Sequence, residues 1–184
     1  MSAASSAELS FRLATPADAL CLSALATQVF LDTYAIEGIR PWLAREVETH
    51  FSPHALDTLL AKPNSTFIIA QRSEHLIAFA QLSEGSFHSL VASARPAELE
   101  RLYVQSPFIG KGIGKAVLQR AEALAASRGA STLWLTAWVG NVRALGFYSS
   151  QGYKDHGSAA YTFEGECFEN RVLSKGISHP PPGE

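Results

Sequence analysis

Cysteine is scarce in this chain, where Cys21 and Cys167 are the only two among 184 residues. Two cysteines cannot build the disulfide framework of a small secreted domain, and a zinc ribbon needs four. Charge is also sparse, since Asp, Glu, Lys and Arg make up 17% of the residues, against about 25% in an average protein. With 15 basic and 17 acidic residues the net charge is −2. This balance argues against broad nucleic-acid binding, which needs a strong basic surplus.

Long apolar runs and targeting signals are missing as well. No run approaches the roughly 18 apolar residues of a membrane-spanning helix. Residues 1–8 contain no basic residue and no apolar stretch follows them, which is unlike a signal peptide. We therefore expect a cytoplasmic protein with no membrane and no nucleic-acid partner. We expect one domain over residues 9–177, between a disordered N-terminus at 1–8 and a disordered, Pro-rich tail at 178–184.

The spacing of apolar residues predicts alternating strands and helices along this domain. Strands are expected at 9–13, 66–71, 76–82, 98–105, 132–139, 153–156 and 167–174. Helices are expected at 17–34, 41–50, 54–61, from 113 to a stop at Gly129, and at 141–151. This order predicts an α/β fold with a central mixed sheet of six to seven strands and about four flanking helices, with the two short helices counted as one region.

A glycine-rich segment from Pro107 to Lys115 lies between a predicted strand and a predicted helix. Gly110, Gly112 and Gly114 allow a tight turn that brings bare backbone N–H groups close to a ligand. The following helix adds free amides and the positive end of its dipole. The segment therefore suits a phosphate or pyrophosphate.

Two common phosphate-binding motifs do not fit this segment. A P-loop would need a glycine where Ile109 stands and a hydroxyl where Ala116 stands. A dinucleotide-binding fingerprint would need a third glycine where, in its two possible registers, Lys115 or Val117 stands. A plain strand–helix turn stays open on this segment alone.

The neighbouring residues resemble a known family. The strand AELERLYV (97–104), the glycine loop and the segment NVRALGFYSSQGY (141–153) resemble the GNAT acetyl-CoA-dependent N-acetyltransferases. The run FLDTYA (30–35) resembles the polyamine-type bacterial branch. The resemblance implies transfer of an acetyl group from acetyl-CoA to a primary amine of a small molecule. Transfer would occur by direct attack in a ternary complex without a metal, and a homodimer is left open.

The resemblance also implies a cofactor site. The pyrophosphate would lie on the amides of residues 110–115, and the Val104 N–H would polarise the thioester carbonyl. Ile109 departs from the family pattern, which has Arg or Gln there; Lys111 or Arg143 is the candidate replacement. The implied cofactor-binding residues are Leu102, Tyr103, Val104, Ile109, Gly110, Lys111, Gly112, Ile113, Gly114, Lys115, Asn141, Arg143, Ala144 and Phe147.

Proton transfer to and from the reacting groups needs an acid and a base. Tyr148 matches the family tyrosine near the CoA sulfur and is the expected general acid, with core packing as the alternative. Glu98 and Glu100 share one face of their strand by its period of two, and either is a candidate base. A solvated strand face or an ion pair is the alternative for both glutamates.

By the same resemblance, the acceptor pocket would involve Phe30, Tyr34, Trp42 and the segment 161–168. A cationic amine is favoured by the acidic residues of the helical region, Asp32, Glu37, Glu46 and Glu48. The His50–His54 spacing does not predict a metal site, because Pro53 interrupts the helix between them. Three other readings stay open: a peptide or protein N-terminal acetyltransferase, a non-catalytic acyl-CoA-binding regulatory domain, and a plain α/β scaffold.

Overall fold

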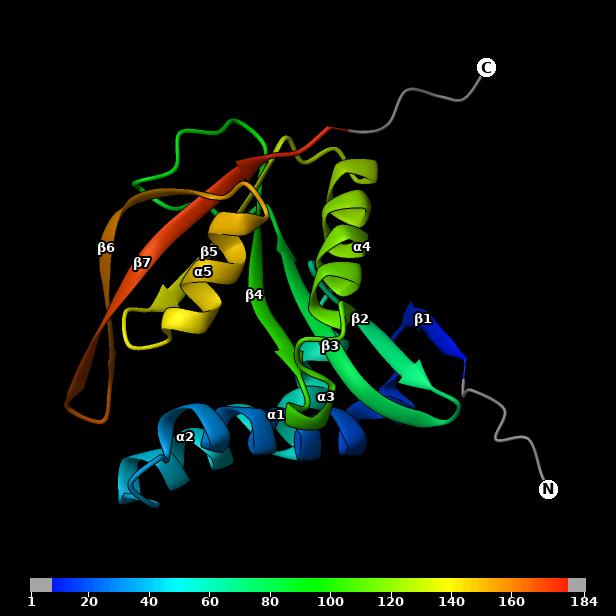
Figure 1. Cartoon of the computed structure of the whole chain (residues 1–184), viewed down its shortest axis with the longest axis vertical. Coiled ribbons are helices and arrows are strands. Elements are labelled where there is room, and N and C mark those ends of the chain that lie inside the picture. Colours follow the sequence, from blue (N-terminus) through cyan, green and yellow to red (C-terminus); the bar gives the residue numbers. More distant parts are fainter. Residues whose placement is uncertain (1–7, 179–184) are drawn as a thin grey trace.

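The computed structural model describes residues 8–178 and is built on one sheet of seven strands (Figure 1). The strands are β1 (Leu9–Leu13), β2 (Ser65–Arg72), β3 (His75–Glu84), β4 (Pro96–Val104), β5 (Thr132–Trp138), β6 (Lys154–Phe163) and β7 (Glu166–Gly176). Their order across the sheet is β1-β2-β3-β4-β5-β7-β6. All neighbours are antiparallel except β4 and β5. The expected mixed α/β fold is thereby confirmed.

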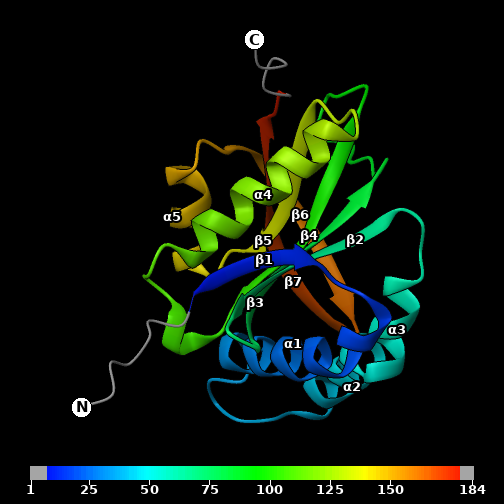
Figure 2. The ribbon, with the colours of Figure 1, turned by 90° about the vertical axis from the view of Figure 1, so that its right-hand side faces the viewer.

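Five α-helices cover the sheet in two groups, as Figure 2 shows from the side. They are α1 (Ala19–Tyr34), α2 (Pro41–Phe51), α3 (Pro53–Leu60), α4 (Ile113–Ser127) and α5 (Val142–Ser150), and two short 3-10 turns occur at Pro16–Asp18 and Ser106–Phe108. α1, α2 and α3 pack together below β2–β4, and their core includes Leu22, Phe30, Leu43 and Phe79. α4 and α5 share a second core with the sheet.

Most predicted boundaries lie within two residues of the observed ones, and two differences have a structural cause. The first helix was expected from residue 17, but residues 16–18 form a 3-10 turn and α1 begins at Ala19. The last hairpin is much longer than the predicted 153–156 and 167–174. β6 and β7 stay paired from Lys154↔Ser174 to Phe163↔Glu166, although this segment has no apolar run. The predicted disordered ends lie almost entirely at 1–7 and 179–184, outside the described residues.

The central parallel pair is short and then separates. β4 pairs with β5 only where residues 96–98 meet residues 132–134, at their N-terminal ends. Beyond this point each strand continues along its antiparallel neighbour, and Figure 1 shows β4 and β5 diverging. β4 also carries a bulge, since Leu99 pairs with Leu82 whereas Arg101 pairs with Gln81. A bulge bends its strand and re-aims side chains, so β4 curves away from β5.

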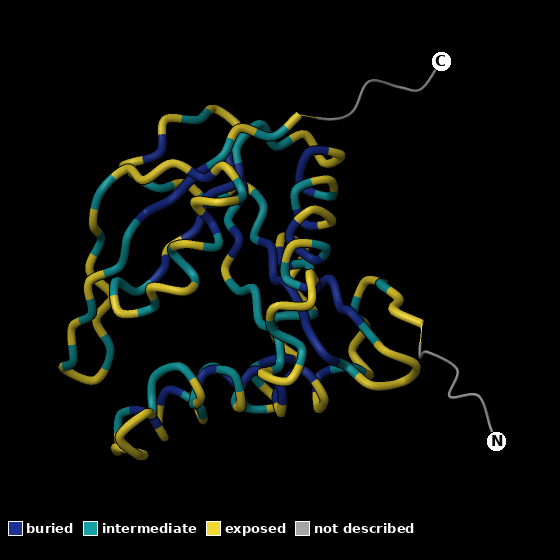
Figure 3. The backbone as a smooth tube through the Cα atoms, viewed as in Figure 1, coloured by how far each residue is buried: buried dark blue, intermediate teal, exposed yellow. Residues whose placement is uncertain are grey.

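Burial follows this architecture. Figure 3 shows buried backbone concentrated in the central strands and in the faces of the helices that meet them. On the α4 side, Val117, Leu118 and Leu133 have at most 1% of their surface exposed. Closely packed residues thus lie beside the point where β4 and β5 separate.

Candidate active site

The glycine loop connects β4 to α4 through the 3-10 turn at residues 106–108. Gly110 has φ +78° and Gly112, the N-cap of α4, has φ +77°. Both lie in the left-handed region that side chains disfavour. A Cβ at either position would meet nothing within 4 Å, so the backbone is open to a ligand there. The Ala116 N–H donates to the Gly112 carbonyl at 3.0 Å. The amides ahead of Ala116 in the first turn have no intrahelical acceptor.

A cavity of about 330 Å³ opens in front of this loop. Its walls come from the C-terminal end of β4, the loop, α5 and the C-terminal half of α1. Twelve of the fourteen predicted cofactor residues line it: Leu102, Tyr103, Val104, Ile109, Gly110, Gly112, Gly114, Lys115, Asn141, Arg143, Ala144 and Phe147. The structure therefore brings together two sequence segments, 102–115 and 141–148, that are separated by the 25 residues from 116 to 140.

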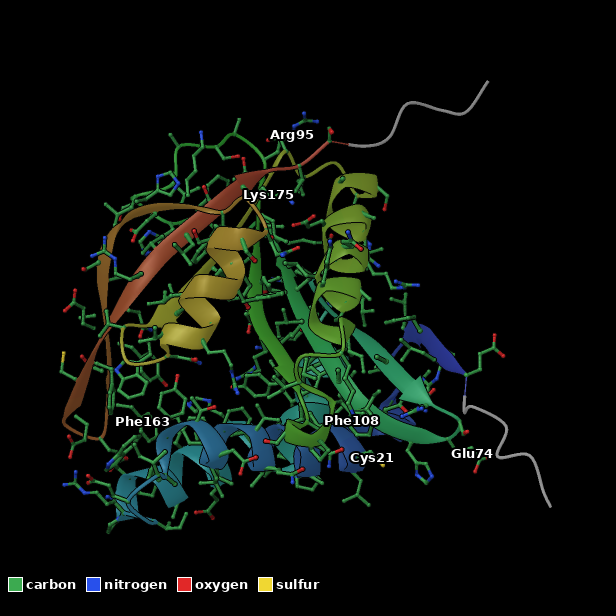
Figure 4. All side chains as sticks on the ribbon, in the orientation of Figure 1. Cys21, Glu74, Arg95, Phe108, Phe163 and Lys175 are labelled. Carbon is green, nitrogen blue, oxygen red and sulfur yellow. The ribbon has the colours of Figure 1, made fainter. Side chains whose placement is uncertain are left out.

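The two remaining predicted residues point elsewhere. Ile113, the first residue of α4, is 6% exposed and packs in the core that α4 and α5 share with the sheet. The Lys111 ammonium lies 5.5 Å from the centre of the Phe108 ring, in a cation–π contact beside the loop. Figure 4 labels Phe108 at this turn. Lys111 thus adds positive charge near the loop without lining the cavity.

The cavity has the charge and shape that a bound polyanion requires. Its charged lining residues are Lys115 and Arg143, both cationic. The Asn141 side chain accepts the Ala144 N–H at 3.1 Å and caps α5, which holds the first turn of that helix against the cavity. Free amides, two cations and glycines with open Cβ positions fit the pyrophosphate and phosphate groups of a CoA molecule.

Tyr148 lies on α5 at the inner end of this cavity. The side chain is 8% exposed, and its ring contacts Phe147 and Tyr153 at centroid distances of 5.2 and 5.6 Å. Burial raises the pKa of the Tyr148 phenol well above its usual value. The hydroxyl therefore keeps its proton at neutral pH, as a proton donor must.

A second cavity of about 250 Å³ adjoins the first. It lies where β4 and β5 separate, because residues 99–103 of β4 and 136–138 of β5 form its walls. All three predicted acceptor residues, Phe30, Tyr34 and Trp42, line it. The two cavities share seven lining residues: Phe30, Tyr34, Leu102, Tyr103, Asn141, Ala144 and Tyr148. Two molecules bound in the two cavities would meet at these shared residues, which include Tyr148.

The two candidate glutamates lie in different environments. Glu100, the extra residue of the β4 bulge, lines the second cavity. It accepts a hydrogen bond from the Ser83 hydroxyl and lies 3.7 Å from the Arg101 guanidinium. Glu98 lies outside the lining of both cavities and accepts the Ser86 hydroxyl at 2.7 Å. Burial raises the pKa of Glu98, which the Ser86 hydrogen bond partly opposes.

The β6–β7 hairpin closes one side of the second cavity by docking on α2. The Tyr161 hydroxyl donates to Glu46 Oε1 at 2.9 Å, and the Trp42 and Phe168 rings lie 5.0 Å apart. At the hairpin tip, Glu164 pairs with an arginine of α2 at 2.8 Å. Figure 4 shows Phe163 directly above α2. The predicted contribution of segment 161–168 agrees with this placement.

Sequence reasoning missed several residues of the second cavity. Phe51, Arg101, Thr136, Trp138 and Asn170 also line it. Alternation along β5 places Trp138 and Thr136 on one face, a signal that was available in the sequence. Asn170 had no such signal, because only the pairing of β7 with β5 brings it to Trp138.

Residues 8–178 were also compared with the requirements of a metal site and of a membrane-spanning helix. In this part of the chain, no group of three or more His, Cys, Asp or Glu side chains is arranged to hold a metal ion. His50, one of the two histidines considered, instead lies 3.9 Å from Glu46. Within the same residues, no helix combines the length and apolar character needed to cross a bilayer.

Two related bacterial sequences carry acetyltransferase names. An N-acetyltransferase of uncharacterised function from Lactobacillus delbrueckii subsp. lactis is 26% identical over 129 residues, which are 70% of this chain and 75% of that protein. An IAA acetyltransferase from Azospirillum brasilense is 34% identical over 110 residues, or 58% of this chain and 66% of that protein.

Solved structures share the fold. The PaiA N-acetyltransferase of Thermoplasma acidophilum, in complex with coenzyme A, superposes with a TM-score of 0.73 at 22% identity, covering 92% of this chain and 99% of that one. YncA of Salmonella typhimurium, a putative acetyltransferase with acetyl-CoA, superposes with a TM-score of 0.64 at 15% identity, covering 96% and 98%. The model of the acetyltransferase (GNAT) family matches residues 35–153, well over half of the chain. The chain therefore belongs to the acetyltransferase (GNAT) family of N-acetyltransferase enzymes.

Proposed function

We propose that this enzyme transfers an acetyl group from acetyl-CoA to a primary amine of a small molecule by direct attack in a ternary complex. The observation that carries the proposal is the pair of adjoining cavities that share Tyr148. One cavity has the amides and cations that suit a polyanion. The other adjoins it and would take the acceptor, which supports binding of both substrates together and direct attack without an acyl-enzyme.

The first cavity is the proposed site of acetyl-CoA, whose thioester supplies the acetyl group. The amides of residues 110–115 would bind the pyrophosphate, and Lys115 and Arg143 would neutralise its charge. Arg143 lines the cavity whereas Lys111 does not, so Arg143 is the better candidate to replace the basic contact absent at Ile109. The Val104 N–H, at the end of β4, would stabilise the developing oxyanion.

The second cavity is the proposed acceptor site. An alkyl ammonium has a pKa near ~10 and must lose a proton before attack. Glu100 lines this cavity and would take that proton, directly or through one water. Tyr148 would donate its proton to the departing sulfur. A volume of about 250 Å³, closed on one side by the β6–β7 hairpin, supports a small acceptor rather than an extended peptide.

Calorimetric titration with acetyl-CoA, followed by assay of free-thiol release, tests the proposal. We expect saturable binding in the micromolar to millimolar range typical of enzyme substrates, and thiol release with at least one small amine from a panel of polyamines, amino acids, aminoglycosides and peptides. No binding would overturn the proposal. Binding without thiol release would favour a regulatory domain, and release only with peptides would favour a peptide or protein acetyltransferase.

The assignment of the base has its own test. In Glu100→Gln we expect kcat/KM to fall by about 100-fold, with a change in the pH–rate profile. Glu98→Gln is the matched control on the same strand and should keep the wild-type profile. An unchanged profile in both variants would remove the two glutamates from proton transfer.

A further inference from the structure

The Trp138 indole forms part of the wall of the second cavity. Trp138 is the last residue of β5 and pairs with Asn170 of β7. Its ring contacts the Tyr34 ring of α1 at a centroid distance of 5.3 Å. Tyr34 lines both cavities, whereas Trp138 lines the second cavity and not the first. We therefore expect a change at this indole to alter the second cavity more than the first.

The backbone around Trp138 is held in place on both sides. The Asn141 N–H donates to the Trp138 carbonyl at 2.9 Å, which closes a turn, and the Asn141 side chain then caps α5. Next to Trp138, the Val139 N–H donates to the Glu169 carbonyl of β7 at 3.0 Å. Because the main chain is fixed in this way, the place of the indole depends on what its ring packs against.

Gly140 lies inside this turn, directly against the indole. A Cβ at position 140 would lie 2.7 Å from Cε2 of Trp138 and closer still to Cζ2 and Cη2. No other glycine of residues 8–178 would bring a Cβ within 3.4 Å of a neighbouring group. The φ of Gly140 lies outside the left-handed region, so the backbone itself accepts other residues. The indole is therefore the reason why a side chain does not fit at position 140.

We infer that Trp138 is a specificity residue that limits the size of the acceptor, and that Gly140 is a positioning residue that lets the indole set this limit. The inference rests on the proposed function, which places the acceptor in the second cavity. A methyl group at position 140 would overlap the ring, and a closely packed site relieves an overlap by moving the side chain. An indole moved off Gly140 would change the room left for the acceptor.

The test measures thiol release with n-alkylamines from propylamine to decylamine, in which only the chain length varies. For the wild type we expect kcat/KM to fall by at least ~10-fold beyond a limiting length, because a fixed wall rejects added methylenes. Trp138→Leu should raise kcat/KM by at least ~10-fold for chains beyond this limit. Gly140→Ala should lower kcat/KM by at least ~10-fold for the longest accepted amine, because the displaced indole narrows the cavity.

A double-mutant cycle separates positioning of the indole from a general disturbance. In the Trp138→Leu background, Gly140→Ala should not move the limit further, because the ring that it displaces is absent. Gly146→Ala is the matched control and should keep the wild-type limit, since Gly146 is an exposed residue of α5 with open space at its Cβ position. The Kd for acetyl-CoA, measured by calorimetry, should stay close to the wild-type value in every variant.

Fluorine NMR of protein labelled with fluorotryptophan follows the indole without turnover. The chain has three tryptophans, and the resonance that is lost in Trp138→Leu identifies Trp138. We expect this resonance to shift in Gly140→Ala and, in the CoA-bound wild type, on addition of an accepted amine. An unshifted resonance in Gly140→Ala would overturn the role of Gly140. If Gly140→Ala does not fold, the limit in Trp138→Leu and the amine-induced shift in the wild type decide.

The outcomes separate this inference from the proposed function. A chain-length limit that is the same in the wild type and in Trp138→Leu would overturn the inference and leave the proposed function standing. So would the absence of any limit in the wild type, or an amine series that never shifts the Trp138 resonance. Failure to bind acetyl-CoA would overturn the proposed function. The free protein would then decide: a Trp138 shift that depends on amine length would support the inference, and no shift would overturn it.

Discussion

The Tyr148 side chain is part of the hydrophobic core and also lines both cavities. Its ring packs in the core shared by α4, α5 and the sheet, and the same residue lines both cavities. Burial raises the pKa of its phenol, so the hydroxyl stays protonated across the physiological range. Packing fixes the ring, and the fixed ring holds the hydroxyl in one place, which is what proton donation to a leaving group requires.

Replacing Tyr148 with Phe tests this role. The ring and its packing are kept, and only the hydroxyl is removed. We expect kcat to fall by about 100-fold while the Kd for acetyl-CoA changes by less than about threefold, since general-acid catalysis is worth roughly 10² or more. Steady-state kinetics and calorimetry measure the two quantities separately.

Tyr153→Phe is the matched control. Tyr153 is also buried, at 5% exposure, and contacts the Tyr148 ring at 5.6 Å, but its hydroxyl donates to Glu122 away from the cavities. We expect near wild-type kcat for this variant. Equal losses of turnover and cofactor affinity in Tyr148→Phe would limit Tyr148 to packing.

For the two glutamates, the sequence predicts the strand but not the bulge that separates their environments. The period of two predicts that Glu98 and Glu100 share one face of β4. In the structure Glu98 accepts a hydrogen bond from Ser86 and Glu100 accepts one from Ser83. The bulge between Leu99 and Arg101 was not predictable, because it depends on how β4 pairs with β3. That pairing leaves Glu100 at the cavity and Glu98 outside it.

Among the elements, the glycine loop is the one on whose conformation the proposed cofactor site depends. Gly112 ends the loop and begins α4 at φ +77° with open space around its missing side chain. A side chain there would project into that space and would strain the turn by about 1–2 kcal/mol. The loop conformation and the access of a ligand to its amides therefore depend on the same glycine.

Gly112→Val should weaken acetyl-CoA binding by at least ~10-fold while leaving a folded protein, because the branched side chain blocks the amides. Calorimetry gives the affinity, and far-UV circular dichroism checks the fold. Gly85→Val is the control, since Gly85 also has a positive φ of +66° and open space but lies in the exposed turn after β3. Unchanged affinity in Gly112→Val would place the cofactor away from the loop.

Elements with strong local signals were predictable and long-range pairings were not. Apolar periodicity together with Thr15-Pro16 and Gly129 located α1 and α4 to within two residues. The β6–β7 hairpin was predicted too short, because the first seven residues of β6 are charged, polar or small and the strand depends on pairing with β7. The docking of this hairpin on α2, which closes one side of the second cavity, had no local signal at all.

At the scale of the whole molecule, edge strand β1 is attached to the rest by a small polar network. Asp18, in the turn before α1, accepts two hydrogen bonds from the Arg12 guanidinium at 2.8 Å and one from the Thr15 N–H at 2.7 Å. Arg12 also donates to Gln71 of β2 at 2.9 Å. The network links β1, β2 and the start of α1, so we expect it to contribute to global stability.

The Arg12 hydrogen bonds lower the pKa of Asp18 from 3.8 to about 2. A carboxyl whose folded pKa is depressed stabilises the fold above its unfolded pKa, and loses that contribution as pH falls through its folded pKa. Asp18→Asn should therefore be less stable than wild type by about 1 kcal/mol at pH 6. The difference should shrink as pH falls from 3.8 towards 2.

Urea unfolding at several pH values measures this difference, and a double-mutant cycle identifies its source. Arg12→Gln should cost a similar amount at pH 6, and the double variant should lose less than the sum of the two single losses, because both substitutions remove the same interaction. A difference between wild type and Asp18→Asn that is the same at pH 6 and at pH 2.5 would mean that the ionised pair does not stabilise the fold. The link between β1 and α1 would then rest on backbone pairing and on neutral hydrogen bonds.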